Sequence, residues 1–217
     1  MLKEKNILWV TFFTIAMVYL ESAIVVYLRG IYGIENLLSD INFTPDKYTI
    51  IEIGREAATI VMLVLIAMIS GNSRQKKFGY FFLAFGIWDI FYYIWLYVFI
   101  QWPKSLMDWD VLFLIPLPWW GPVISPILIS VILITTGYLL IKEINYKITL
   151  IDLTIISISV ITLLYTFVED SIIIILTGQG SITEVRPSSF NWILFSIAII
   201  TWIALTIKVF LPGPRRT

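Results

Sequence analysis

Six predominantly apolar runs, each of about 20 residues, recur along this 217-residue chain. A helix of that length crosses the hydrocarbon core of a lipid bilayer. We therefore predict an all-α fold, a polytopic integral membrane bundle of six transmembrane helices that forms one domain over residues 1–217. The predicted spans are 7–28, 48–69, 78–100, 123–141, 148–168 and 190–210.

The composition supports a membrane protein without a sizeable soluble domain. Hydrophobic residues make up 59% of the chain and charged residues only 14%, whereas a soluble domain is nearer half apolar and a quarter charged. Such a chain has too little polar surface to cover a water-facing globule. The expected partner is the lipid bilayer, and a formal net charge of +0 gives no indication of nucleic acid.

Lysine and arginine are distributed unevenly between the two ends of the predicted helices. Ten lie on one side, four lie on the other, and Arg55 falls inside a span. Because cytoplasmic loops carry an excess of these residues, we expect a multi-pass protein of the plasma membrane with both termini in the cytoplasm. The ten are Lys3, Lys5, Arg74, Lys76, Lys77, Lys142, Lys147, Lys208, Arg215 and Arg216, and the four are Arg29, Lys47, Lys104 and Arg186.

Two missing residue types limit the available chemistry. Without cysteine the chain forms no disulfide, iron–sulfur cluster or catalytic thiol. Without histidine it has no histidine-ligated haem or zinc and no histidine-based triad. Retinal on Lys208 is not expected, because this lysine lies near the predicted cytoplasmic end of a six-span chain. No cofactor is evident, although a divalent cation on carboxylate oxygens remains open.

Six charged residues fall within the predicted spans. Each charge costs roughly 2.5–3.5 kcal/mol at the bilayer centre, so six facing lipid would cost on the order of 15 kcal/mol. That sum exceeds the stability of a typical domain. We expect these side chains to pair, to be protonated or to face a polar interior. They are Glu21, Glu52, Arg55, Glu56, Asp89 and Asp152.

Most of these charges are expected to meet in the outer half of the membrane. In the second span, polar residues recur at i, i+4, i+7, i+8 and i+11, which is one face of a helix. The charged residues form either a structural Arg–carboxylate network that fixes helix register or a functional site. We favour the functional site, because the acids outnumber the arginines there and the excess requires protonation, a bound cation or a basic substrate. The predicted binding cluster is Glu21, Glu52, Arg55, Glu56, Asp89 and Tyr93, and any metal would be held by Glu52, Glu56 and Asp89. The predicted rim is Arg29, Asp108, Asp110, Trp119, Trp120, Glu169 and Asp170.

Three further segments permit more than one interpretation. Prolines 116, 118, 122 and 126 break the segment 111–126 before span four. It is either re-entrant or an interfacial loop, and we favour the loop. Residues 172–176 either extend span five or lie along the outer surface. Polar residues along span five, from Thr149 to Asp170, suggest an ion path or helix packing. We favour packing, with Asp152 directed toward Lys147.

Three functions fit this pattern, and whether the protein is an enzyme stays open. The favoured hypothesis is a small ion- or proton-linked transporter with an acidic pocket open to the outer face. The alternative is an intramembrane enzyme that acts on a lipid or isoprenoid-like substrate, using carboxylates or a carboxylate-bound divalent cation. The third is an accessory subunit of a membrane complex, in which an oligomer partner covers part of the charge.

Overall fold

A computed structural model of the chain describes residues 2–40, 46–142, 149–178, 180–181, 185–187 and 189–210. Six helices are long and apolar enough to span a membrane, which confirms the predicted all-α, six-span bundle. They are α1 (Leu2–Tyr32), α3 (Lys47–Ser70), α4 (Arg74–Ile100), α5 (Ile124–Ile141), α6 (Leu150–Thr177) and α7 (Trp192–Phe210). A short helix, α2 (Leu37–Asp40), and two strands, β1 (Trp109–Phe113) and β2 (Trp119–Pro122), complete the fold.

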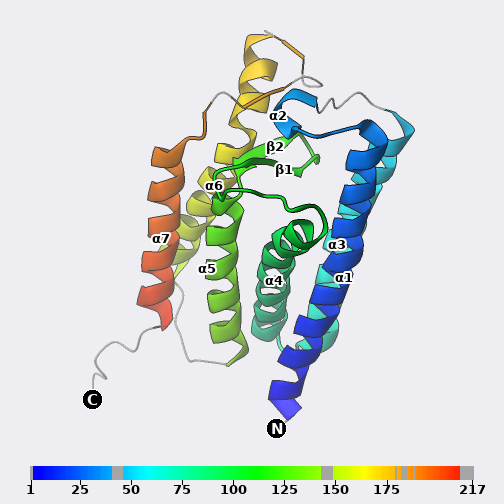
Figure 1. Ribbon diagram of the computed structural model, residues 1–217. Helices are drawn as coiled ribbons and strands as arrows, with labels where there is room; N and C mark the ends of the chain where they lie inside the picture. The colour runs from blue at the N-terminus through cyan, green and yellow to red at the C-terminus, as the bar shows by residue number, and fades with distance from the viewer. Residues whose placement is uncertain are drawn as a thin grey trace, which may run out of the picture.

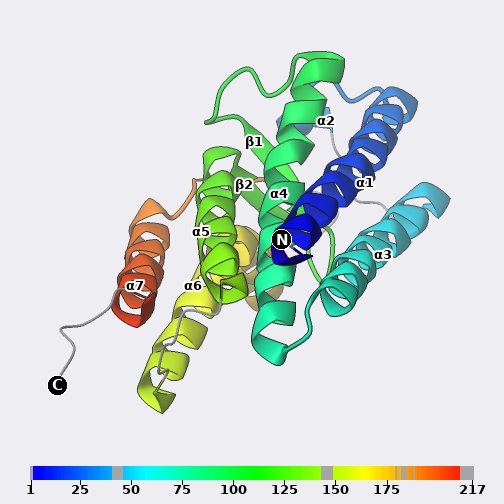
Figure 2. The ribbon, with the colours of Figure 1, turned by 90° about the horizontal axis from the view of Figure 1, so that it is seen from below.

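The two ends of the bundle differ in structure (Figure 1). Helix α1 begins and α7 ends at the lower end, which we call the terminal end. Helix α2 and both strands lie toward the opposite end, which we call the hairpin end. Seen along the bundle, α4 lies between the α1–α3 pair and α5 (Figure 2). Helix α4 therefore joins two groups of three helices.

Polar side chains fix where the helices begin. The Asp46 carboxylate accepts a hydrogen bond from the Thr49 backbone N at 2.7 Å, and this bond holds the pKa of Asp46 below its ordinary value. Thr149 and Asp152 form a reciprocal capping box at the start of α6. These caps satisfy backbone N–H groups that have no partner within the helix.

Each group of three helices has its own apolar core. Val18, Leu63 and Ala84 are fully buried between α1, α3 and α4. In the other group, Leu163, Phe167 and Phe195 pack between α6 and α7. Large apolar side chains elsewhere on the helices are exposed, as expected for surfaces that contact lipid.

Glycines bring α4 and α5 into close contact. A Cβ atom built at Gly86 would lie 2.6 Å from the Ser130 carbonyl oxygen, and one at Gly137 would lie 2.6 Å from the Gly79 carbonyl oxygen. Only a residue without a side chain permits backbones to approach so closely, as in other membrane helix pairs. The two halves of the bundle are consequently joined along a tight interface.

The proline-containing segment before α5 differs from the predicted irregular loop. It folds as an antiparallel β-hairpin in which Asp110 pairs with Gly121 and Trp109 with Pro122. A two-stranded sheet has edges on both sides, and edge strands tolerate proline because its missing N–H is not needed there. The prolines therefore prevent a helix in this segment but are compatible with a β-hairpin.

Span five also settles two open points. Residues 172–176 belong to α6 and extend it. The Ser159 hydroxyl donates to the Ala198 carbonyl at 2.5 Å, so part of the polar seam joins α6 to α7. Asp152 pairs with Lys208 at 2.6 Å. Lys147, which was the predicted partner of Asp152, lies outside the described residues.

Candidate functional site

A cavity of about 310 Å³ lies between α1, α3, α4 and the β-hairpin, toward the hairpin end. Exposed Tyr32 and Asp40 line its mouth, and buried Glu21 and Trp88 line its deep end. The structure brings the whole predicted cluster to this cavity, together with two residues of the predicted rim. The cluster residues are Glu21, Glu52, Arg55, Glu56, Asp89 and Tyr93, and the rim residues are Arg29 and Asp110.

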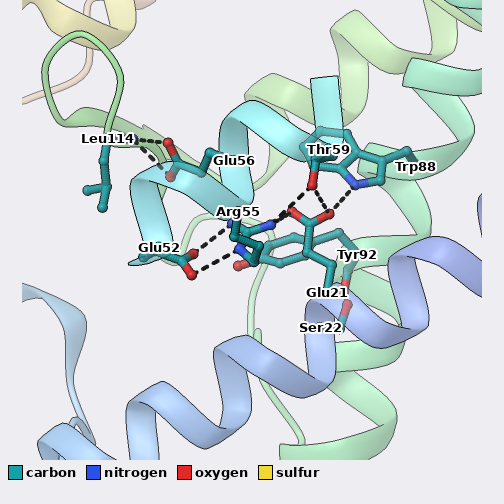
Figure 3. A network of polar contacts seen from close by, with 9 residues as sticks. All are labelled: Glu21, Ser22, Glu52, Arg55, Glu56, Thr59, Trp88, Tyr92 and Leu114. Atoms are coloured by element: carbon teal, nitrogen blue, oxygen red, sulfur yellow. Dashed lines mark hydrogen bonds and ion pairs between the residues drawn. The ribbon is translucent and has the colours of Figure 1, made fainter. Parts of the chain in front are cut away.

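Arg55 is the centre of a charged network at the deep end (Figure 3). Its guanidinium donates to both carboxylate oxygens of Glu52, at 2.9 and 2.7 Å, and forms an ion pair with Glu21. The second Glu21 oxygen accepts from Trp88 Nε1 at 2.7 Å and from Thr59 Oγ1 at 3.1 Å. Because these residues come from α1, α3 and α4, the network fixes the three helices relative to one another.

Glu56 occupies the next turn position on α3 but has a different kind of partner. Its side chain is 4% exposed, and both carboxylate oxygens lie 3.0 Å from the Leu114 backbone N. Among the described residues no lysine or arginine forms an ion pair with Glu56. Arg55 acts on Glu56 electrostatically but forms no direct ion pair with it, and a buried carboxylate without an ion pair favours binding a proton or a cation.

Asp89 is the second buried acid without a cationic partner in the part of the chain that the structure describes. It is 8% exposed and accepts one hydrogen bond, from Ser130 Oγ of α5 at 2.8 Å. The contact lies next to the close approach of Gly86 to Ser130. The α4–α5 interface therefore positions this carboxylate at the cavity wall.

Asp110 of β1 supplies a third buried acid, with an exposed fraction of 2%. Arg29 Nη2 lies 3.7 Å from Asp110 Oδ1, and the Arg29 guanidinium lies 4.0 Å above the Trp102 ring. Burial raises the pKa of Asp110 to about 6, although Arg29 and the nearby Tyr93 hydroxyl favour the charged form. Asp110 is thus largely ionised at neutral pH.

Three polar atoms in this part of the cavity lack a hydrogen bond of acceptable geometry. They are Asp110 Oδ2, the Tyr93 hydroxyl and Arg29 Nε. Tyr93 and Asp110 interact electrostatically, but their geometry does not complete a bond. Buried polar atoms are usually satisfied. A ligand or water that reaches this wall would therefore meet unsatisfied acceptors and donors.

The other five predicted rim residues are not among the residues that line this cavity. The Asp108 carboxylate accepts from the Lys104 and Ser105 backbone N atoms and shapes a turn. Trp119 stacks on Phe167 of α6 and packs in the core of the second helix group. Being near the same membrane face did not bring these side chains together: Trp119 packs in the core around Phe167, and Trp120 packs with Leu37 and Val185 behind the cavity wall. The remaining three are Trp120, Glu169 and Asp170.

Sequence reasoning missed the contribution of the hairpin to the wall. Val111, Leu112 and Leu114 line the cavity, and the Leu114 backbone N is the partner of Glu56. A backbone donor leaves no signal in residue type. Asp110 was already part of the predicted rim, because it was expected on the outer side of the membrane.

The proposed metal ligands are held by different groups. Glu52 is engaged by Arg55, Glu56 by the Leu114 backbone and Asp89 by Ser130. Within the described residues, no three acidic side chains form a group that could hold a metal ion. As arranged, these carboxylates are suited to accepting hydrogen bonds from N–H or O–H donors.

No family model matches this chain, and comparison with curated proteins and with solved structures likewise finds no match. The fold and the site define a six-span membrane protein with an acidic cavity at one end of the bundle.

Proposed function

We propose that the protein is a small ion- or proton-linked transporter whose acidic cavity opens to the outer face of the plasma membrane. The observation that carries this proposal is that Glu56 and Asp89, both buried at the cavity, have no cationic partner among the described residues. An uncompensated buried carboxylate is costly. Each group is more favourable when it binds a proton or a cation, and transport requires that binding to be reversible.

The distribution of cations supports the orientation. Among the described residues, the cations of the terminal side include Arg74, Lys76, Lys77, Lys142 and Lys208, and those of the hairpin side are Arg29, Lys47, Lys104 and Arg186. With the sequence-wide excess of lysine and arginine on the terminal side, this distribution favours a cytoplasmic terminal end. The cavity then faces outward.

A closed apolar layer beneath the cavity supports transport further. Val18, Leu63 and Ala84 are fully buried just below the Glu21–Trp88 contact. On the other side of this layer, a smaller cavity of about 100 Å³ is lined by residues that include Asn6, Ser70 and Lys76. Two cavities at opposite ends of α1, α3 and α4, with buried apolar side chains between them, fit a transporter closed toward the cytoplasm.

Flux through reconstituted vesicles tests the proposal. Liposomes containing the protein and an internal pH dye would receive an inward proton gradient, with and without sodium or potassium. We expect the wild type to dissipate a gradient faster than protein-free vesicles, and Glu56→Gln with Asp89→Asn to abolish the difference. Asp152→Asn is the matched control, since it removes a buried carboxylate at the opposite end. Undiminished flux in the double variant would contradict the proposal.

One observation favours the alternative of an intramembrane enzyme acting on a lipid. Of the 22 residues that line the cavity, twelve are aliphatic or aromatic, which suits a hydrocarbon substrate. Glu56 and Asp89 would then act as general acid and base. Mass spectrometry of lipids that co-purify with the wild type, but not with the double variant, would favour this function over transport.

A further inference from the structure

The charges of the cavity define which ligand it can accept. Its lining carries seven carboxylates and only two guanidiniums. Arg55 is already shared between Glu21 and Glu52, and Arg29 is directed toward Asp110. The lining therefore favours a positively charged ligand over an anionic one. The carboxylates are Glu21, Asp40, Asp46, Glu52, Glu56, Asp89 and Asp110.

The walls favour an organic cation over a bare ion. The volume of about 310 Å³ is at the small end of the range for small-molecule sites and far exceeds what one ion fills. Val25 and Leu28 of α1 and Leu112 of β1 provide aliphatic surface, and Tyr92 and Tyr93 lie edge to face with ring centroids 5.2 Å apart. Hydrated ions gain nothing from such surfaces, whereas a hydrocarbon group is stabilised by them.

The unsatisfied atoms define the head group. Within the part of the chain that the structure describes, Asp110 Oδ2 accepts no hydrogen bond, and the buried Tyr93 hydroxyl, although close to Asp110, completes none. Asp89 has a single donor, Ser130. A ligand that donates several N–H bonds would complete these groups, whereas a quaternary ammonium ion has no N–H to donate. A charge-assisted bond of this kind is stronger than a neutral one.

We infer that the cavity binds a protonated primary or secondary amine with a compact apolar group, its ammonium directed to Asp110, Asp89 and the Tyr93 hydroxyl. The inference deepens the proposed function, because it names the substrate class of the same site. The hydrocarbon part lies against the aliphatic wall of α1 and β1. Tyr93 and Asp110 are ligand-binding residues in this arrangement.

Direct binding to the purified full chain in detergent tests the inference. Calorimetry and intrinsic-fluorescence melting at pH 7.5 would compare four probes of one skeleton: 2-phenylethylammonium, its N-trimethyl analogue, 2-phenylethanol and phenylalanine. We expect the primary ammonium to bind at least tenfold more tightly than the other three and to raise Tm. Equal binding of the trimethyl analogue would overturn the N–H requirement. Tighter binding of phenylalanine would overturn the cationic ligand in favour of a zwitterion.

Variants identify the atoms involved. Asp110→Asn is expected to weaken 2-phenylethylammonium binding at least tenfold. Tyr93→Phe removes only the hydroxyl and is expected to weaken binding about three- to tenfold, while Tyr97→Phe, one turn further along α4, leaves it unchanged. If Asp110→Asn does not fold, two comparisons still test the inference. They are Tyr93→Phe against Tyr97→Phe, and the four probes on the wild type. Unchanged binding in Tyr93→Phe would contradict the assigned site.

Binding and flux separate this inference from the proposed function. Selective amine binding without any flux in vesicles would contradict the proposed transport and support the amine site. Proton or alkali-cation flux that depends on Glu56 and Asp89, without selective amine binding, would contradict the amine site and support the proposed transport.

Discussion

Both carboxylate oxygens of Glu56 lie 3.0 Å from the backbone N of Leu114, so a membrane helix holds the β-hairpin through a buried acid. The contact connects α3 to the residue that directly follows β1. The hairpin in turn carries Asp110 into the cavity. A substitution at Glu56 is therefore expected to change the position of Asp110 in the cavity.

Glu56→Leu should release the hairpin. The substitution leaves the Leu114 N–H without an acceptor, which costs about 1–3 kcal/mol. Glu56→Gln retains a side-chain oxygen and should cost much less. Hydrogen exchange read by mass spectrometry should show faster exchange over 109–122 in Glu56→Leu alone. Equal exchange in both variants would indicate that this contact does not hold the hairpin.

Arg55→Gln should be strongly destabilising. It leaves Glu21, which is 6% exposed, without its cation, and breaking a buried pair costs about 3–5 kcal/mol. Adding Glu21→Gln removes the unpaired carboxylate and should recover part of the lost free energy of unfolding. Denaturant unfolding of both single variants and the double variant gives this double-mutant cycle. Lys208→Gln breaks an ion pair whose lysine side chain is 64% exposed, so solvent screening predicts a smaller loss. Equal losses in the two single variants would contradict a buried network.

Asp110 should make stability depend on pH between about 4 and 6. Burial raises the pKa of Asp110 to about 6 from 3.8, so the folded state binds the proton more tightly than the unfolded state. Well below pH 4 the Asp110 carboxyl is protonated in both states and does not lower the free energy of unfolding. As the pH rises through 6, its ionisation lowers the free energy of unfolding by up to roughly 3 kcal/mol. The Tm difference between Asp110→Asn and the wild type should therefore increase over that range and then level off. A difference that is constant with pH would show that Asp110 ionises as in water.

Gly86→Ala should separate α4 from α5. The added Cβ would meet the Ser130 carbonyl oxygen at 2.6 Å, and overpacking of this kind costs about 1–3 kcal/mol. Because Ser130 also donates to Asp89, the variant should weaken ligand binding as well as lower Tm. Gly54→Ala is the control on α3, where nothing lies within 4 Å, and helix propensity predicts a neutral to slightly stabilising effect. Equal Tm changes in both variants would rule out a tight interface.

The six helices could be predicted because length and hydropathy are local properties of the chain. The side chains of α3 that face the cavity could also be placed, because one helical face carried Glu52, Arg55 and Glu56. What could not be predicted depends on contacts between distant segments. The pairing of Asp152 with Lys208 joins residues 56 positions apart, and no periodicity indicates such a pair.

The rim shows the same limit from another side. Trp119 and Glu169 share a bundle end with Asp110, yet only Asp110 lines the cavity. Hydropathy assigns each residue a depth but not a direction around the bundle. That direction depends on long-range packing: the hairpin contacts one helix core through Phe113 and the other through Trp109 and Trp119.

The shortness of α5 has a consequence for the membrane in which this protein works. Its 18 residues span about 27 Å, whereas the 28 residues of α6 span about 42 Å. The hairpin directly precedes α5, so its strands lie near the boundary of a hydrocarbon core of about 30 Å. A thicker bilayer would place the hairpin, which has no exposed residue in either strand, at the depth of the acyl chains. Lipid chain length should therefore act on the acidic cavity through the hairpin, without any lipid entering it.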